Sequence, residues 1–132
     1  MKKKGNKSLY IEERDLALVS NFHRLLREYT VLDLDEIFAE IALDTPAPRY
    51  YISEDRAYAA LLYKRRTGHF DVRDGRRRAL LEDLEADVPE ILKRGDADRL
   101  LDAVYIAVNN PAPSFYLTPG SVRTLIYAAL AK

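Results

Sequence analysis

The chain has 132 residues, no cysteine, and equal numbers of basic and acidic residues, 21 of each. The lack of cysteine excludes a disulfide scaffold, a cysteine nucleophile and a thiolate metal site. No apolar run approaches the roughly 20 residues that a membrane-spanning helix needs, so we expect no membrane partner. The basic N-terminus is not followed by an apolar signal core, so we expect no secretion signal.

The charge is distributed unevenly along the chain. Residues 1–7 carry four lysines and no acid, residues 64–78 carry seven basic and two acidic residues, and the remainder has a net charge of −9. Such asymmetry bears on partners rather than on fold. We expect residues 1–9 to form a disordered basic arm and residues 10–132 to fold as a single domain.

Apolar residues at helical spacing predict three helices in the first half of the chain. The first covers residues 12–29. The second follows Asp33, a predicted N-cap, and ends before Pro46, because the residue preceding a proline avoids the helical conformation. The third begins after Ser53, another N-cap, and ends near Gly68, a residue suited to a helix C-cap.

Three further helices are predicted in the second half. The fourth starts at Arg76, and Pro89 should kink or restart it because proline has no backbone N–H to donate. Asp96 is the predicted cap of the fifth helix. Thr118 is the predicted cap of the sixth, with Pro119 at the first helical position, where proline is favoured.

Two segments share one pattern and lie 65 residues apart. They are Pro46-Ala47-Pro48-Arg49-Tyr50-Tyr51-Ile52-Ser53 and Pro111-Ala112-Pro113-Ser114-Phe115-Tyr116-Leu117-Thr118. The same shift aligns Leu16 with Leu81. We interpret the pattern as two tandem repeats, residues 10–67 and 76–132, joined by a basic linker. Two short coincidences are the alternative interpretation.

The extended segments leave backbone groups that need hydrogen-bond partners. We expect residues near 49–53 to pair antiparallel with residues near 114–118, forming a short two-stranded β ribbon on a pseudo-twofold axis, covered by helices. Tyr51 and Tyr116 are expected to pack beneath this ribbon, which leaves Tyr50 and Phe115 exposed. The predicted fold is therefore all-α, with about six helices in two tandem repeats and one short β pair.

Both motifs resemble a group of small uncharacterised helical proteins from phages and mobile elements of Bacteroidetes, which carry a duplicated PAP-x-[YF]-Y motif. The resemblance rests on residues 111–119 and on the first motif continued by Ser53-Glu54-Asp55-Arg56-Ala57, and it covers most of residues 40–132. It implies a phage or mobile-element setting in the cytoplasm of a bacterial host, or association with the virion. It implies no activity and no catalytic residue.

Catalytic and metal-binding patterns are weak. His23 and His69 have no partner at ligand spacing, and no HExxH pattern or glycine-rich phosphate loop is present. Glu36 and Glu40 lie on one helix face, where paired carboxylates suit acid–base work or a metal, but such a pair is more often a solvated face. We therefore expect a non-enzymatic protein with no catalytic residue, no metal and no cofactor.

The basic stretch between the third and fourth helices is the best candidate site. Its basic residues are Lys64, Arg65, Arg66, Arg73, Arg76, Arg77 and Arg78. Arginine forms paired hydrogen bonds with phosphate, and Tyr58 and Tyr63 lie near enough to offer stacking surfaces. The second and third helices are too far apart for a helix-turn-helix, so we expect electrostatic backbone binding of nucleic acid.

Two other interpretations stay open. A solvated loop that pairs with the acidic remainder of the chain also explains the basic stretch. A structural or adaptor protein, such as a virion component or a subunit of a homo-oligomer, would instead act through protein–protein contacts at the aromatic motifs. Neither DNA nor RNA is favoured by the sequence.

Overall fold

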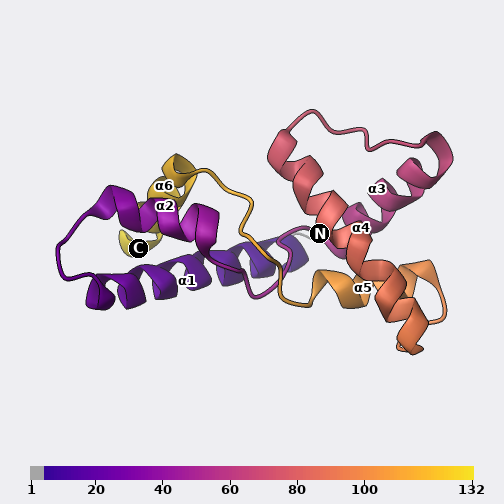
Figure 1. Cartoon of the computed structure of the whole chain (residues 1–132), viewed down its shortest axis with the longest axis horizontal. Coiled ribbons are helices and arrows are strands. Elements are labelled where there is room, and N and C mark those ends of the chain that lie inside the picture. Colours follow the sequence, from indigo (N-terminus) through magenta and orange to yellow (C-terminus); the bar gives the residue numbers. More distant parts are fainter. Residues whose placement is uncertain (1–4) are drawn as a thin grey trace. The chain divides into compact units, whose positions relative to one another are not determined.

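The computed structural model of the protein describes residues 5–132, with side chains from Tyr10 onward (Figure 1). Its regular structure consists of six helices. They are α1 (Gly5–Glu28), α2 (Leu34–Asp44), α3 (Glu54–Thr67), α4 (Gly75–Arg94), α5 (Leu100–Val108) and α6 (Pro119–Leu130). Residues 5–132 contain no β-strand. The predicted all-α class with six helices is confirmed.

The helices form two compact units, and each unit contains helices from both of the predicted repeats. Unit 1 holds α1, α2 and α6, and its chain leaves at Ala47 and returns at Pro113. Unit 2 holds α3, α4 and α5 and is one continuous segment, residues 48–112. Each unit thus takes two helices from one half of the chain and its third helix from the other half. The segments 10–67 and 76–132 therefore do not each form a compact body.

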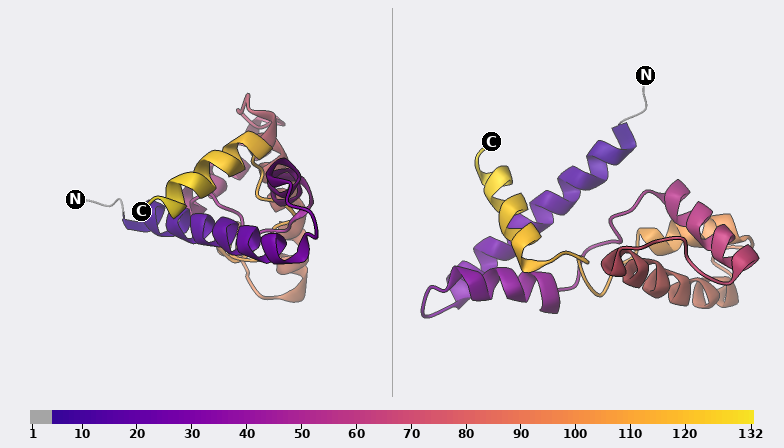
Figure 2. Two further views of the ribbon diagram at one scale, coloured as in Figure 1. Left: turned by 90° about the vertical axis from the view of Figure 1, so that its left-hand side faces the viewer. Right: turned by 90° about the horizontal axis from the view of Figure 1, so that it is seen from above.

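In unit 1, α6 packs against both α1 and α2 (Figure 2). The Phe38 ring lies at the centre of this core, stacked on Phe22 at a centroid distance of 5.5 Å and edge-on to Tyr127 at 5.7 Å. The core also contains Phe115 and many aliphatic side chains, and each fully buried side chain of this kind contributes roughly 1.5–3 kcal/mol. Its fully buried members include Leu18, Leu25, Ile37, Ile41, Val122 and Ile126.

In unit 2, α5 packs against both α3 and α4, which touch each other less extensively. Small residues on α3 and α5 allow close helix approach, while α4 supplies the larger side chains. The buried residues are Ala57 and Leu61 of α3, Leu80, Leu81, Leu84, Val88 and Ile91 of α4, and Ala103, Val104, Ala107 and Val108 of α5. A loop of residues 68–74 runs from the end of α3 to the start of α4 (Figures 1 and 2).

Buried positions of the two units recur along the chain at a spacing of 65 or 66 residues. The spacing is 66 residues for Leu18, Phe22 and Leu25 of α1 against Leu84, Val88 and Ile91 of α4, and for Ile37, Phe38, Ile41 and Ala42 of α2 against Ala103, Val104, Ala107 and Val108 of α5. It is 65 residues for Ala57 and Leu61 of α3 against Val122 and Ile126 of α6. The predicted equivalence of Leu16 with Leu81 fails, because Leu16 is 69% exposed and Leu81 is 1% exposed.

Four predicted helix caps are present. Asp33 Oδ1 and Ser53 Oγ each accept a 3.2 Å hydrogen bond from the backbone N–H three residues on. Thr118 Oγ1 accepts the equivalent bond from Ser121 at 3.0 Å, with Pro119 in the first turn. Gly68 ends α3 with φ +92°, a conformation that glycine adopts without a steric penalty.

Other predicted boundaries differ. Helix α1 begins at Gly5, within the predicted arm, and residues 1–4 of that arm lie outside the described residues. Helix α4 continues through Pro89 without restarting. Helix α5 begins at Leu100, and its N-cap residue is Arg99, which makes no side-chain capping bond. The predicted cap Asp96 instead accepts a hydrogen bond from Arg94 at 3.1 Å.

The predicted β ribbon is not formed, since neither residues 49–53 nor residues 114–118 are a strand. Their backbone groups find partners in other ways. The N–H of Tyr50 donates to the carbonyl of Val108 at 3.0 Å, and the N–H of Tyr116 donates to Ser114 Oγ at 2.9 Å. Tyr116 also has φ +58°, which ends any extended run. Among residues 5–132, only Ala47 and Ala112 take part in isolated β-bridges.

The aromatic side chains of the two motifs point opposite to the prediction. Tyr50 is 1% exposed and Phe115 is 4% exposed, whereas Tyr51 and Tyr116 are half-buried. The prediction placed them by strand alternation, and a single-residue error in such an alternation moves every side chain to the other face. The aromatic edge proposed as a protein interface is therefore buried.

Candidate nucleic-acid interface

All seven basic residues of the predicted site lie in unit 2, on the end of α3, the loop of residues 68–74 and the start of α4. Local signals place them there. The N–H of Gly68 donates to the carbonyl of Lys64 at 2.7 Å and turns the chain out of α3. Asp74 caps α4 by accepting a 3.1 Å hydrogen bond from the backbone N–H of Arg76. The site is thus one helix–loop–helix segment.

The loop is anchored to the unit rather than free. Phe70 is 7% exposed, and Lys64 Nζ lies 4.9 Å from the centre of its ring. The rings of Tyr63 and His69 meet edge to face at 5.7 Å. Arg78 donates a hydrogen bond to the carbonyl oxygen of Val72. These contacts hold the loop in one path across the ends of the two helices.

Lys64 is engaged by the unit itself. Its ammonium forms a 2.6 Å ion pair with Glu85 Oε1 on α4, in addition to its contact with the Phe70 ring. Arg78 is likewise used to hold the loop. These two side chains are therefore structural parts of the site.

Five arginines remain: Arg65, Arg66, Arg73, Arg76 and Arg77. Arg77 is half-buried and the other four are exposed. Within residues 5–132, none of the five forms an ion pair with a carboxylate. Their positive charges are thus left available on the surface of unit 2.

The start of α4 places cations where the helix dipole disfavours them. The positive end of a helix dipole lies at its N-terminus, and the first turn of α4 contains no acidic residue. Arg76, Arg77 and Arg78 occupy this turn, which follows the N-cap Asp74. The arginines at the end of α3 lie at the favourable end of their helix. An anion bound near the start of α4 would offset the local repulsion.

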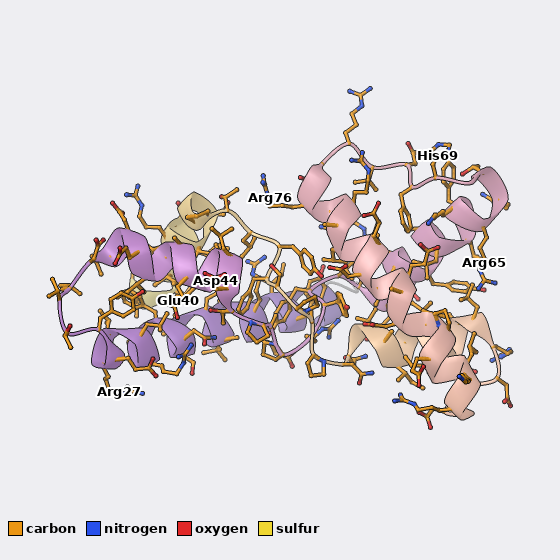
Figure 3. The ribbon with its side chains drawn as sticks, viewed as in Figure 1. Arg27, Glu40, Asp44, Arg65, His69 and Arg76 are labelled. Atoms are coloured by element: carbon orange, nitrogen blue, oxygen red, sulfur yellow. The ribbon has the colours of Figure 1, made fainter. Side chains whose placement is uncertain are left out.

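Two of the arginines mark the two ends of the loop. In Figure 3, Arg65 on α3 and Arg76 on α4 lie at opposite ends of the loop and extend in different directions. Cations at both ends of the loop suit an extended polyanion better than a single phosphate group.

The other residues considered as sites are not brought together. His23 is exposed on α1, at a centroid distance of 6.1 Å from the ring of Phe22. Glu40 accepts a 2.8 Å hydrogen bond from the Tyr29 hydroxyl, which raises the pKa of Tyr29 to about 12, and Glu36 is exposed. In the part of the chain that the structure describes, no group of three or more histidine, aspartate or glutamate side chains is placed to hold a metal ion.

Sequence reasoning missed two residues that shape the site. Glu85 neutralises Lys64 from 21 positions further along the chain, at a separation that no local pattern reveals. Phe70 anchors the loop, and its signal was visible, since it is a large apolar residue in an otherwise polar linker.

None of the helices among residues 5–132 has the length and apolar character needed to cross a bilayer. Comparisons with protein-family models, with curated proteins and with solved structures return no match.

Proposed function

We propose that this protein binds the phosphate backbone of nucleic acid through Arg65, Arg66, Arg73, Arg76 and Arg77. One observation carries the proposal: five arginines on a single helix–loop–helix segment have no carboxylate partner in the described part of the chain. The guanidinium group matches phosphate geometry, and a bound polyanion would relieve the repulsion at the start of α4.

The binding is electrostatic and has little sequence preference, because the connection between α2 and α3 is too long for a helix-turn-helix and the arginines extend over two helix ends and a loop. If all five neutralise phosphates, counterion release gives a slope of log K against log salt of about −4.5 for duplex DNA and about −3.5 for a single strand. The Tyr63 and His69 rings beside Arg65 and Arg66 are available for base stacking on a single strand.

The test is fluorescence anisotropy with labelled duplex and single-stranded oligonucleotides across a salt series. We expect the double variant Arg65→Ala with Arg76→Ala to bind more weakly. Its slope of log K against log salt should be shallower by roughly the contribution of two phosphate contacts. Arg27→Ala with Arg123→Ala is the matched control, since it removes two exposed arginines from helices α1 and α6 of unit 1. Equal losses in both pairs, or no binding by the wild type near 100 mM salt, would refute the proposal.

The setting and the ancestry of the protein are part of the same proposal. The likeness of the two Pro-Ala-Pro motifs to phage and mobile-element proteins supports action in the cytoplasm of a bacterial host or in a virion. The recurrent spacing of buried positions supports descent from a duplicated half, with a one-residue length change between α2 and the first Pro-Ala-Pro or between α5 and the second. The protein is proposed to act without catalysis, metal or cofactor.

A second candidate is a structural or adaptor role through protein–protein contacts. The observation that favours it is the exposure of large apolar side chains in unit 1, namely Leu16, Val31, Leu32 and Leu43, each at least 67% exposed. Exposed apolar patches often mark interaction sites. Val31→Ser with Leu32→Ser should then abolish assembly in light scattering without changing nucleic-acid affinity. Unchanged assembly in that variant would exclude the α1–α2 loop as the contact.

A further inference from the structure

We infer that a second copy of this chain is a binding partner, and that the two copies associate by exchanging α6. In the dimer, α6 of one copy would pack on α1 and α2 of the other and would take the place of the resident helix. The argument rests on how unit 1 is assembled and on the connector that leads into α6.

Unit 1 is the unit that depends on a distant segment. Unit 2 is continuous from residue 48 to residue 112, whereas α1 and α2 of unit 1 are completed by a helix at the other end of the chain. The core contacts made by α6 involve Val122, Ile126 and the Tyr127 ring, which meets Phe38. These contacts depend only on the presence of α6. The helix of a second copy reproduces all of them.

The connector that leads into α6 is long and contains two prolines. It runs from Asn109 to Thr118 between α5 and α6 and spans up to about 35 Å when extended. Pro111 and Pro113 are both exposed and hold the backbone out of a helical turn. The boundary of the units falls between Ala112 and Pro113. Exchange of an element across a hinge of this kind is a low-cost route to dimers.

The same connector holds a disfavoured conformation. Tyr116 has φ +58°, and among residues 5–132 it is the one non-glycine residue with a positive φ. A bulky L-residue rarely adopts this region. The segment leading into α3 has no such residue. Opening the connector frees Tyr116 from this conformation in both copies, which favours exchange of α6 over exchange of α3.

The first experiment measures the dimer dissociation constant of the full chain by light scattering from about 1 μM to 1 mM, a range that covers weak association. The test compares Tyr116→Gly with Tyr116→Ala. Both substitutions remove the ring, but only glycine accepts a positive φ freely. Because two connectors open per dimer, we expect Tyr116→Gly to dimerise about tenfold or more weakly than Tyr116→Ala. Equal constants, or a wild-type monomer at every concentration, would overturn the inference.

The second experiment identifies the exchanged helix by complementation. Ile126→Asp damages the buried face of α6, and Ile41→Asp damages the buried face of α2. When the two variants are unfolded, mixed and refolded, helix exchange gives a heterodimer with one intact unit 1, whereas each variant alone gives none. Recovery of about half of the unit 1 signal in the mixture alone supports exchange. No recovery on mixing, or dimerisation of the Ile126→Asp variant at wild-type strength, contradicts it.

Discussion

The hydroxyl of Tyr50 donates a 2.7 Å hydrogen bond to Asp87 Oδ2, which joins the segment before α3 to the side of α4 in unit 2. Tyr50 is 1% exposed, and its burial and this hydrogen bond both raise the pKa of the hydroxyl above its ordinary value near 10. The phenol is thereby kept neutral in the folded chain at pH values where an exposed tyrosine ionises.

We expect Tyr50→Phe to lower the free energy of unfolding by about 1 kcal/mol near pH 7, because Asp87 loses its donor. The wild type should lose stability as the pH rises above about 10, since Tyr50 then ionises in the unfolded chain but not in the folded one. Urea unfolding between pH 8 and pH 11 should show a shallower decline in Tyr50→Phe. An unchanged decline in that variant would show that Tyr50 does not control it.

The local elements were predictable because their signals are local. Asp33, Ser53, Gly68 and Thr118 end or begin helices through contacts within a few residues. The sequence did not show which pair of helices α3 and α6 would each pack against. Residues 57 and 61 of α3 and residues 122 and 126 of α6 present similar buried faces, so the apolar pattern alone does not say which pair of helices each one completes.

For the candidate site too, the sequence predicted the local feature but not its tertiary contacts. The sequence showed the basic stretch. Among the described residues, Lys64 pairs with a carboxylate and Arg78 bonds to a backbone carbonyl, while the other five cations have neither of these side-chain contacts. The sequence did not show that Lys64 is held by Glu85 or that Arg78 bonds to the loop, because both depend on how α3 and α4 pack. The orientation of Tyr50 was missed because the segment was treated as a strand.

The arginines at the start of α4 should trade stability for binding. Arg76→Ala with Arg77→Ala removes two cations from the positive end of a helix dipole, so we expect the free energy of unfolding to rise by about 0.3–1 kcal/mol per residue at low salt. Nucleic-acid affinity should fall in the same variant. Thermal unfolding and anisotropy on one preparation measure both effects.

The matched control for this pair lies at the other end of the same helix. Lys93 is exposed in the last turn of α4, where a cation is favourable. Lys93→Ala should therefore lower stability slightly and leave binding unchanged. If Arg76→Ala with Arg77→Ala destabilises the protein instead, the dipole argument fails whatever happens to binding.

Pro89 should limit the stability of unit 2. It is exposed inside α4, where it lacks an N–H for the carbonyl of Glu85 and crowds that group. We expect Pro89→Ala to raise the free energy of unfolding by up to about 3 kcal/mol, visible as a higher melting temperature. Pro119→Ala is the control, because proline is favoured at the first helical position and its loss should bring no gain. Similar increases in the free energy of unfolding at both positions would show that the place of Pro89 inside α4 is not the cause.

Lys64 should behave as a structural residue, unlike its neighbour Arg66. Its side chain is 31% exposed and pairs with Glu85, so the pair is only partly shielded from water. A double-mutant cycle of Lys64→Met and Glu85→Gln should give a coupling of about 1 kcal/mol or less, measured by urea unfolding. Methionine keeps the apolar contact with Phe70, so the loop should retain its path and nucleic-acid affinity should change less than about twofold. Arg66→Met removes the same charge from a cation without a carboxylate partner in the described chain and should weaken binding more. Equal losses of nucleic-acid affinity from the two substitutions would show that Lys64 also contacts the nucleic acid.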